Sequence, residues 1–230
     1  MRPTSLDKKA VVLLSGGLDS ATAFYIARRE GYSCYCLSFD YGQRHRKELD
    51  YAQKLAQRAQ CPWEAVSFIL PWKGSALLDN TLSIPMGRSS HEMHQGIPIT
   101  YVPARNSIFL SFAASWAEVI GAFSLYIGAN ALDFSGYPDC RPEYFERFNR
   151  MIEKGTRKRE EGIKVVAPLV NKTKADIIQW GHTLGVPYEW TWSCYEGGEF
   201  PCGSCDSCLL RAKGFQEAGI EDPLLESRRR

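Results

Sequence analysis

Six residues near the N-terminus, Ser15 to Ser20, constrain this chain more than any other segment. They read S-G-G-L-D-S and lie between an apolar run at residues 10–14, typical of a buried parallel strand, and residues 21–30, which favour a helix ended by Gly31. A glycine-rich turn between a strand and a helix directs backbone N–H groups and the positive end of the helix toward one point. The segment therefore predicts an anion site, with an ordinary strand-to-helix turn as the alternative.

The residue types in this turn indicate a phosphate chain that carries a divalent cation. Gly16 and Gly17 allow the backbone to approach phosphate oxygens, and the hydroxyls of Ser15 and Ser20 add donors. Asp19 would repel a bare anion, but a carboxylate is suited to Mg²⁺ on a triphosphate. Neither a Walker A lysine nor a G-x-G-x-x-G fingerprint occurs here. The turn resembles the pyrophosphatase loop of the N-type ATP pyrophosphatases, which split ATP between the α and β phosphates.

Alternating strand and helix patterns predict one α/β domain with a mostly parallel sheet and helices on both faces. Strands are expected at residues 10–14, 33–39, 63–69, 123–127 and 164–169, and helices at residues 21–30, 44–59, 106–120, 142–154 and 173–185. The Pro-, Gly- and Ser-rich residues 71–100 indicate a long loop. Ligands of such sheets bind beyond the carboxyl ends of the strands. The loops after residues 14, 39 and 128 should therefore surround one crevice.

Four of the eight cysteines form a compact motif near the C-terminus: Cys194, Cys202, Cys205 and Cys208. The spacing, C-x7-C-x2-C-x2-C, suits a closed tetrahedral site for structural Zn²⁺, with a redox pair as the alternative. We expect zinc to stabilise residues 190–230 as the C-terminal region of a single domain of residues 1–230. The cysteines at positions 34, 36, 61 and 140 are expected to be buried, inert thiols, with Cys140 the closest of them to the site.

Composition argues against several classes of protein. The chain has 230 residues with a formal net charge of +2, so it lacks the strongly basic character of a dedicated nucleic-acid binder. It contains no apolar run long enough to span a bilayer, and its first residues lack the apolar core of a secretory signal. We therefore expect a cytoplasmic protein with small-molecule substrates and without a nucleic-acid or membrane partner.

Longer stretches of the chain resemble the 7-cyano-7-deazaguanine synthases of the queuosine precursor pathway, a family of N-type ATP pyrophosphatases. The resemblance covers nearly the whole chain and is carried by residues 14–24, 39–45, 102–106, 128–130, 135–141 and 167–172 together with the four-cysteine motif. The strings D-Y-G-Q-R-H at residues 40–45 and S-G-Y-P-D-C-R at residues 135–141 are the most specific. The resemblance implies a Rossmann-like, adenine nucleotide alpha hydrolase-like fold with a C-terminal zinc knuckle.

The resemblance also implies an ATP-dependent carbon–nitrogen ligase that forms a nitrile. In this family 7-carboxy-7-deazaguanine is adenylated, ammonia converts the adenylate to an amide, and a second adenylation leads to 7-cyano-7-deazaguanine with release of AMP and pyrophosphate. ATP, Mg²⁺ and Zn²⁺ are the implied cofactors, and relatives suggest a homodimer. The alternatives are another amide- or thio-forming adenylating enzyme of the superfamily and a zinc-knuckle module that binds nucleic acid.

The remaining candidate residues lie in the resembling strings. Arg105 is expected to clamp a phosphate or carboxylate, with a structural ion pair as the alternative. Asp133 and Asp139 are candidates for Mg²⁺ or for the donor edge of the guanine-like base, with a capping role as the alternative. Tyr41 and Tyr137 are candidates for stacking on a base or for plain packing.

The complete expectation places the candidates in three groups, and three residues belong to two of them. Catalytic roles are expected for Asp19, Arg105 and Asp133; nucleotide binding for Leu14, Ser15, Gly16, Gly17, Leu18, Asp19, Ser20 and Phe39; and substrate binding for Tyr41, Arg105, Asp133, Tyr137 and Asp139. His45 is a further candidate for moving a proton, with plain hydrogen bonding as the alternative.

Overall fold

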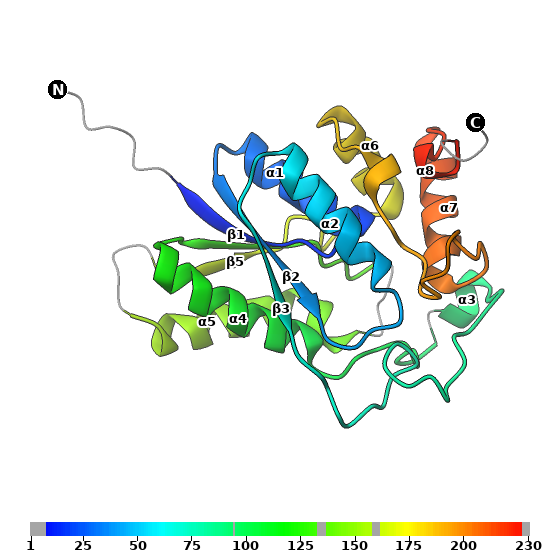
Figure 1. Cartoon of the computed structure of the whole chain (residues 1–230), viewed down its shortest axis with the longest axis horizontal. Helices are drawn as coiled ribbons and strands as arrows, with labels where there is room; N and C mark the ends of the chain where they lie inside the picture. The colour runs from blue at the N-terminus through cyan, green and yellow to red at the C-terminus, as the bar shows by residue number, and fades with distance from the viewer. Residues whose placement is uncertain (1–7, 94, 133–136, 158–161, 227–230) are drawn as a thin grey trace.

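A five-stranded parallel sheet forms the centre of the molecule (Figure 1). The computed structural model describes residues 8–93, 95–132, 137–157 and 162–226. The strand order is β3-β2-β1-β4-β5, with β1 at Lys9–Leu13, β2 at Ser33–Asp40, β3 at Trp63–Ser67, β4 at Ser124–Ile127 and β5 at Lys164–Val166. Each strand begins within one residue of its expected position. Strand β5 ends earlier than expected, and in the turns that follow it the Asn130 amide donates to the carbonyls of Leu169 and Lys172.

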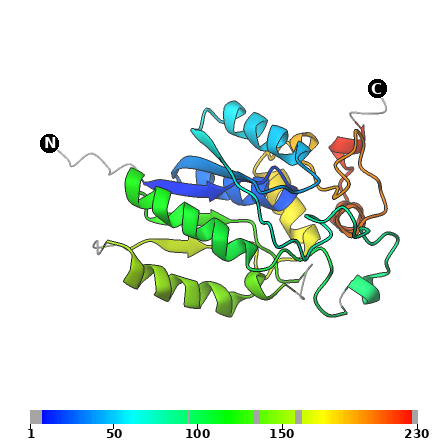
Figure 2. The ribbon, with the colours of Figure 1, turned by 60° about the horizontal axis from the view of Figure 1, so that its bottom comes forward.

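Helices cover both faces of the sheet (Figures 1 and 2). The longer ones are α1 at Leu18–Arg29, α2 at Lys47–Arg58, α4 at Arg105–Ile120, α5 at Pro142–Gly155, α6 at Lys174–Thr183 and α7 at Asp206–Ala218. Short helices are α3 at Ser90–Met93, α8 at Pro223–Glu226 and two 3-10 turns, η1 at Pro138–Cys140 and η2 at Tyr188–Trp190. Within the described residues, no helix has the length and apolar character needed to cross a membrane.

The core has two layers, one on each face of the sheet. Val11 and Leu13 of β1 face the layer formed with α4 and α5, whereas Val12 faces the layer formed with α1, α2 and α6. Both faces of the strand are thus buried, which explains the uninterrupted apolar run in the sequence. Burial of a large apolar side chain contributes roughly 1.5–3 kcal/mol, so these layers hold the ends of the strands in fixed positions.

Helix α7 was not expected from the sequence. It extends the core layer formed with α1, α2 and α6. It packs against α6, and Phe215 on α7 belongs to the same buried cluster as α1 and α6. The close approach depends on Gly214, because a Cβ at this position would lie 2.2 Å from Cγ of Lys174. The apolar pattern of α7 is weak since its buried face includes a glycine and an arginine, Arg211.

The long connection between β3 and α4 docks onto the C-terminal region. Only the short α3 interrupts it among its described residues, so the expected loop is confirmed. Met86 forms a bridge with Cys205, the Gly87 N–H donates to the Ser204 carbonyl at 2.8 Å, and Arg88 forms an ion pair with Asp206. This connection therefore joins the middle of the sequence to the start of α7.

Candidate active site

A cavity of about 230 Å³ opens at the carboxyl ends of β1, β2 and β4. The chain order of the strands reverses beside β1, and ligands of open α/β sheets bind at such a switch point. Predicted residues that line the cavity are Leu14, Ser15, Gly17, Leu18, Asp19, Ser20, Phe39, Tyr41, Arg105 and Tyr137. Cys140 and His45 also line it. The sequence-derived crevice and the observed cavity therefore coincide.

The turn of residues 15–20 is closed by its own side chains. The hydroxyls of Ser15 and Ser20 lie 3.0 Å apart, and Ser20 Oγ donates to the Gly17 carbonyl at 3.0 Å. Helix α1 begins at Leu18, so Gly17 is its N-cap residue and Ser20 lies in the first helical turn. The first N–H groups of a helix have no partner within the helix, and here they lie at the cavity wall, where an anion can bind.

Two glycines let neighbouring backbone segments approach this turn. Gly16 has a φ of +88°, and a Cβ on it would lie 2.0 Å from the Glu48 carbonyl oxygen on α2. Gly128 follows β4 directly, and a Cβ there would lie 2.6 Å from backbone atoms of Asp19 and Ser20. Gly16 therefore does not line the cavity; it allows α2 to pack behind the turn.

Asp19 is paired with a lysine that sequence analysis did not select as a site residue. The ammonium of Lys174, the first residue of α6, donates to both Asp19 carboxylate oxygens, at 2.7 and 2.8 Å. Both residues line the cavity. A carboxylate and an ammonium side by side suit a divalent cation and a phosphate, respectively. In the sequence, Lys174 stands out only as a residue at the start of the helix expected at residues 173–185.

Arg105, the first residue of α4, presents a half-buried guanidinium to the cavity. One of its nitrogens donates to the Tyr41 hydroxyl at 3.4 Å, and within the described part of the chain no carboxylate forms an ion pair with it. Burial raises the pKa of Tyr41 and of Tyr137, so both phenols remain neutral. A half-buried cation whose hydrogen bond goes to a neutral phenol is suited to an anionic group of a ligand.

Asp139, another predicted carboxylate, does not line the cavity. Asp139 is buried beneath α4: its Oδ2 accepts from the Asn106 N–H at 3.0 Å, and its carbonyl accepts from the Asn106 amide at 2.9 Å. Burial raises the pKa of the Asp139 carboxyl. Asp139 thus caps the helix that begins with Arg105, which is the alternative that the sequence left open. Asp133 lies outside the described residues.

Several polar residues that sequence analysis did not select as site residues also line the cavity. They are Glu48, Asn130, Lys174, Ser193, Ser207 and Arg211. Arg211 on α7 is buried and donates to both carboxylate oxygens of Asp222, at 2.6 and 2.8 Å, so its charge is neutralised within the fold. Only Asn130 lay in a motif that sequence analysis had noted.

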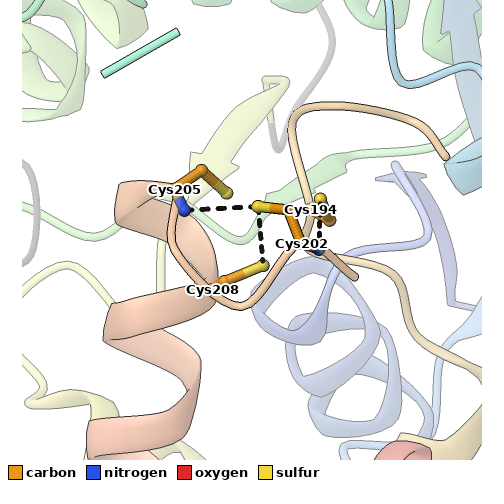
Figure 3. A group of neighbouring side chains, drawn as sticks. All are labelled: Cys194, Cys202, Cys205 and Cys208. Carbon is orange, nitrogen blue, oxygen red and sulfur yellow. Dashed lines mark hydrogen bonds between the residues drawn. The ribbon is translucent and has the colours of Figure 1, made fainter. Parts of the chain in front are cut away.

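The four cysteines form a compact cluster whose sulfur atoms point toward one another (Figure 3). The sulfurs all lie within 4.8 Å, and those of Cys202 and Cys208 are 3.9 Å apart. Zn–S bonds of about 2.3 Å in a tetrahedron would place sulfurs roughly 3.8 Å apart, so the donor set fits a four-coordinate metal. The N–H groups of Cys202 and Cys205 donate to the sulfurs of Cys194 and Cys202, each at 3.3 Å. Such bonds stabilise thiolates.

Comparison with known proteins decides the family. The model of the family described as "Queuosine biosynthesis protein QueC" matches residues 9–219. The chain is 57% identical over 221 residues to the 7-cyano-7-deazaguanine synthase of Trichodesmium erythraeum, which covers 94% of this chain and 100% of that protein. The chain belongs to the QueC family. A second QueC-family relative, the 7-cyano-7-deazaguanine synthase of Nostoc punctiforme, is 55% identical to this chain over 221 residues. The alignment covers 94% of this chain and 99% of that protein.

A solved structure supports the fold of this QueC-family chain. NMN synthetase from Francisella tularensis superposes with a TM-score of 0.51 at 17% identity, over 96% of this chain and 78% of that one. The expected fold, a parallel α/β sheet of the adenine nucleotide hydrolase-like type with a C-terminal cysteine cluster, is therefore confirmed. The family match favours the synthase over a sister adenylating enzyme or a nucleic-acid-binding knuckle.

Proposed function

We propose that this QueC-family chain, an ATP-dependent 7-cyano-7-deazaguanine synthase of queuosine biosynthesis, holds the triphosphate of ATP at residues 15–20 and its acid substrate beside Arg105. The supporting observation is that one cavity contains a helix N-terminus, the Asp19–Lys174 pair and a guanidinium without a described carboxylate partner. These groups match a triphosphate, its divalent cation and a carboxylate, respectively.

The β and γ phosphates would occupy the N-terminal end of α1. Ser15, Ser20 and the first N–H groups of α1 would donate to their oxygens, and Lys174 would add a positive charge. Asp19 would hold Mg²⁺, which when bound neutralises negative charge that develops on pyrophosphate as it leaves. Loss of one preorganised donor in a comparable site costs roughly 3–4 kcal/mol of transition-state stabilisation.

The acid 7-carboxy-7-deazaguanine would bind between Arg105 and the two neutral phenols of Tyr41 and Tyr137. A carboxylate resists attack by ammonia because it is anionic and lacks a leaving group. Transfer of AMP supplies that leaving group, and ammonia then gives the amide. A second adenylation, on the amide oxygen, allows loss of AMP to form the nitrile, so that each turnover converts two ATP to two AMP and two pyrophosphates.

Chromatographic analysis of the acid, ATP and ammonium with the purified chain tests this proposal. We expect two AMP for each nitrile formed. Absence of AMP with this acid would contradict the proposal. Asp19→Asn should abolish AMP formation while metal analysis still finds about one zinc per chain, since the cysteine cluster is separate from Asp19. Full activity in this variant would show that Asp19 does not hold the cation.

We further propose that the four cysteines hold Zn²⁺, which stabilises residues 190–230 as part of a single domain of residues 1–230, and that the enzyme is cytoplasmic. A homodimer is also proposed. Its support is the exposed apolar surface on one side of the sheet, where Phe112 and Val119 of α4 are 41% and 81% exposed and Ile69 after β3 is 79% exposed. Light scattering during size exclusion would test the dimer, and a monomeric mass at micromolar concentration would contradict it.

A further inference from the structure

The proposed reaction needs a proton acceptor that the groups discussed so far do not supply. When ammonia attacks the acyl adenylate, a C–N bond forms, the C–O bond to AMP breaks and one proton leaves the nitrogen. When the amide oxygen attacks the second ATP, an O–P bond forms, pyrophosphate leaves and the nitrogen loses another proton. When the second AMP leaves, the C=N double bond becomes the C≡N triple bond and the nitrogen loses a third proton. The first adenylation, in contrast, releases no proton.

A histidine and a glutamate in the cavity wall form a dyad. His45 lies just before α2 and is 5% exposed, and Glu48 lies in the first turn of α2. His45 Nε2 is 3.3 Å from Glu48 Oε1. Since a carboxylate oxygen accepts hydrogen bonds, this contact favours the tautomer with the proton on Nε2 and a lone pair on Nδ1.

The second ring nitrogen of His45 lacks a partner. Among the described residues, Nδ1 is buried and forms no hydrogen bond. Buried polar atoms in folded proteins are nearly always satisfied, so a buried nitrogen left without a partner in a cavity wall indicates a group that a ligand completes. A carboxylate that fixes the tautomer of an imidazole also produces the general base of Ser-His-Asp hydrolases, although there the carboxylate binds Nδ1 and the base is Nε2.

The surroundings of the ring suit an imidazole that gains and loses a proton. Glu48 is the anionic group nearest to it on α2, and its carboxylate would stabilise the imidazolium. The ring centroids of Tyr195 and His45 are 5.8 Å apart, and burial holds the pKa of Tyr195 well above its usual range, so this phenol stays neutral. Arg105 and the Asp19–Lys174 pair share the cavity.

We propose that His45 Nδ1 accepts the protons that the reacting nitrogen loses, with Glu48 as the residue that positions the ring. The inference rests on the proposed function. Because all three protons leave the same nitrogen atom, one acceptor at one position serves all three steps. Each proton passes from nitrogen to Nδ1, and the imidazolium returns it to solvent before the next step.

Two assays separate this role from a structural one. Pyrophosphate–ATP exchange with the acid but without ammonium measures the first adenylation, in which no proton is lost. Nitrile formation with ammonium measures the later steps. In His45→Gln we expect the exchange rate of the wild-type chain, whereas nitrile formation falls by roughly 10²–10⁴-fold. His182→Gln, at an exposed position on α6, is the matched control and should change neither rate.

Each other result has a definite meaning. Unchanged nitrile formation in His45→Gln would overturn the inference, and an equal fall in both rates would show a structural role and overturn it as well. A wild-type chain without exchange would contradict the proposed function itself, and the inference with it.

Glu48→Gln removes the charge that stabilises the imidazolium, so the rising limb of the pH profile of nitrile formation should move to lower pH. An unmoved limb would exclude Glu48 as the positioning residue.

Discussion

Two glycines with the same backbone conformation differ in what surrounds them. Gly16 and Gly42 both have a φ of +88°, but a Cβ on Gly42 would meet nothing within 4 Å, whereas one on Gly16 would lie 2.0 Å from the Glu48 carbonyl oxygen. Gly42→Ala should therefore lower the free energy of unfolding only by the strain of the left-handed conformation, about 1–2 kcal/mol. Gly16→Ala should cost more and also reduce ATP exchange, because α2 must move away from the phosphate turn.

Urea unfolding of the two glycine variants measures this difference. Equal losses of stability would mean that the contact with α2 adds nothing to the backbone strain, and that Gly16 is needed only for its φ angle.

A second prediction at this scale concerns Cys61, which is half-buried rather than buried as expected. A hydrogen bond from the Cys36 thiol lowers the pKa of Cys61 to about 7, while burial raises the pKa of Cys34 to about 12. The thiolate is the reactive form, so its fraction at Cys61 should rise through pH 7, below the ordinary range near 8.5.

Iodoacetamide labelling followed by peptide mass spectrometry tests this. The labelling rate of Cys61 should increase between about pH 6 and 8 and then level off, with Cys34 unlabelled throughout. A rate at Cys61 that still climbs steeply above pH 8 would contradict the lowered pKa.

Sequence reasoning found the residues that are neighbours along the chain and missed those that are neighbours only in space. Ser15 to Ser20 form one turn, so their type and order were enough to place this turn at the ligand crevice, and the structure has a cavity there. Lys174 reaches Asp19 from 155 residues away, and no local pattern connects the two. For Asp139 the sequence left a ligand role and a capping role open, because its bond to the Asn106 N–H depends on tertiary packing.

At the scale of helices and strands, predictions succeeded where a pattern had a local cause. Helix α6 begins within one residue of its expected start, where a capping box fixes it: Thr173 Oγ1 accepts from the Asp176 N–H at 3.1 Å, and the Asp176 carboxylate accepts from the Thr173 N–H at 3.0 Å. The start of α1 was placed too late, at residue 21, whereas the helix begins at Leu18 with Gly17 as its N-cap residue. Helix α7 was missed because its buried face is not a continuous apolar stripe.

The ion pair between Arg88 and Asp206 should hold the long connection on α7. Asp206 is nearly fully buried, and two nitrogens of Arg88 donate to its carboxylate. Arg88→Ala leaves the Asp206 charge without its partner, so we expect the free energy of unfolding to fall by roughly 3 kcal/mol. This value is the lower end of the range for a buried ion pair, because the Arg88 side chain is 21% exposed.

Lys213→Ala is the matched control for this variant. It removes an exposed pair with Glu217 on the same helix and should have no measurable effect on urea unfolding. Similar losses in the two variants would show that the Arg88 pair contributes no more than a surface pair.

For the molecule as a whole, the cysteine cluster connects parts that are far apart in the sequence. Ala76 and Ile84 of the long connection share a buried cluster with Trp192 and three of the cysteines. We expect a chelator, or Cys202→Ser, to lower the melting temperature of the whole chain, because metal binding in small zinc modules is worth about 10–16 kcal/mol. Calorimetry with metal analysis tests this, with Cys61→Ser as a control that should keep its zinc.

If zinc removal left a single unfolding transition at an unchanged temperature, the cluster would not stabilise the molecule.

The overall architecture was predictable from sequence because each strand and most helices have their own apolar pattern. The docking of residues 76–88 onto the cysteine cluster was not, since it depends on contacts between segments more than 100 residues apart.

The bond between Gly87 and Ser204 also bears on how the chain is made. During synthesis, the segment around Gly87 leaves the ribosome long before its partner residues exist. It must wait, uncovered, until the last tenth or so of the chain emerges, because pairings of such long range form late. Arrival of a metal ion at the newly made cysteines would then be the event that completes the fold.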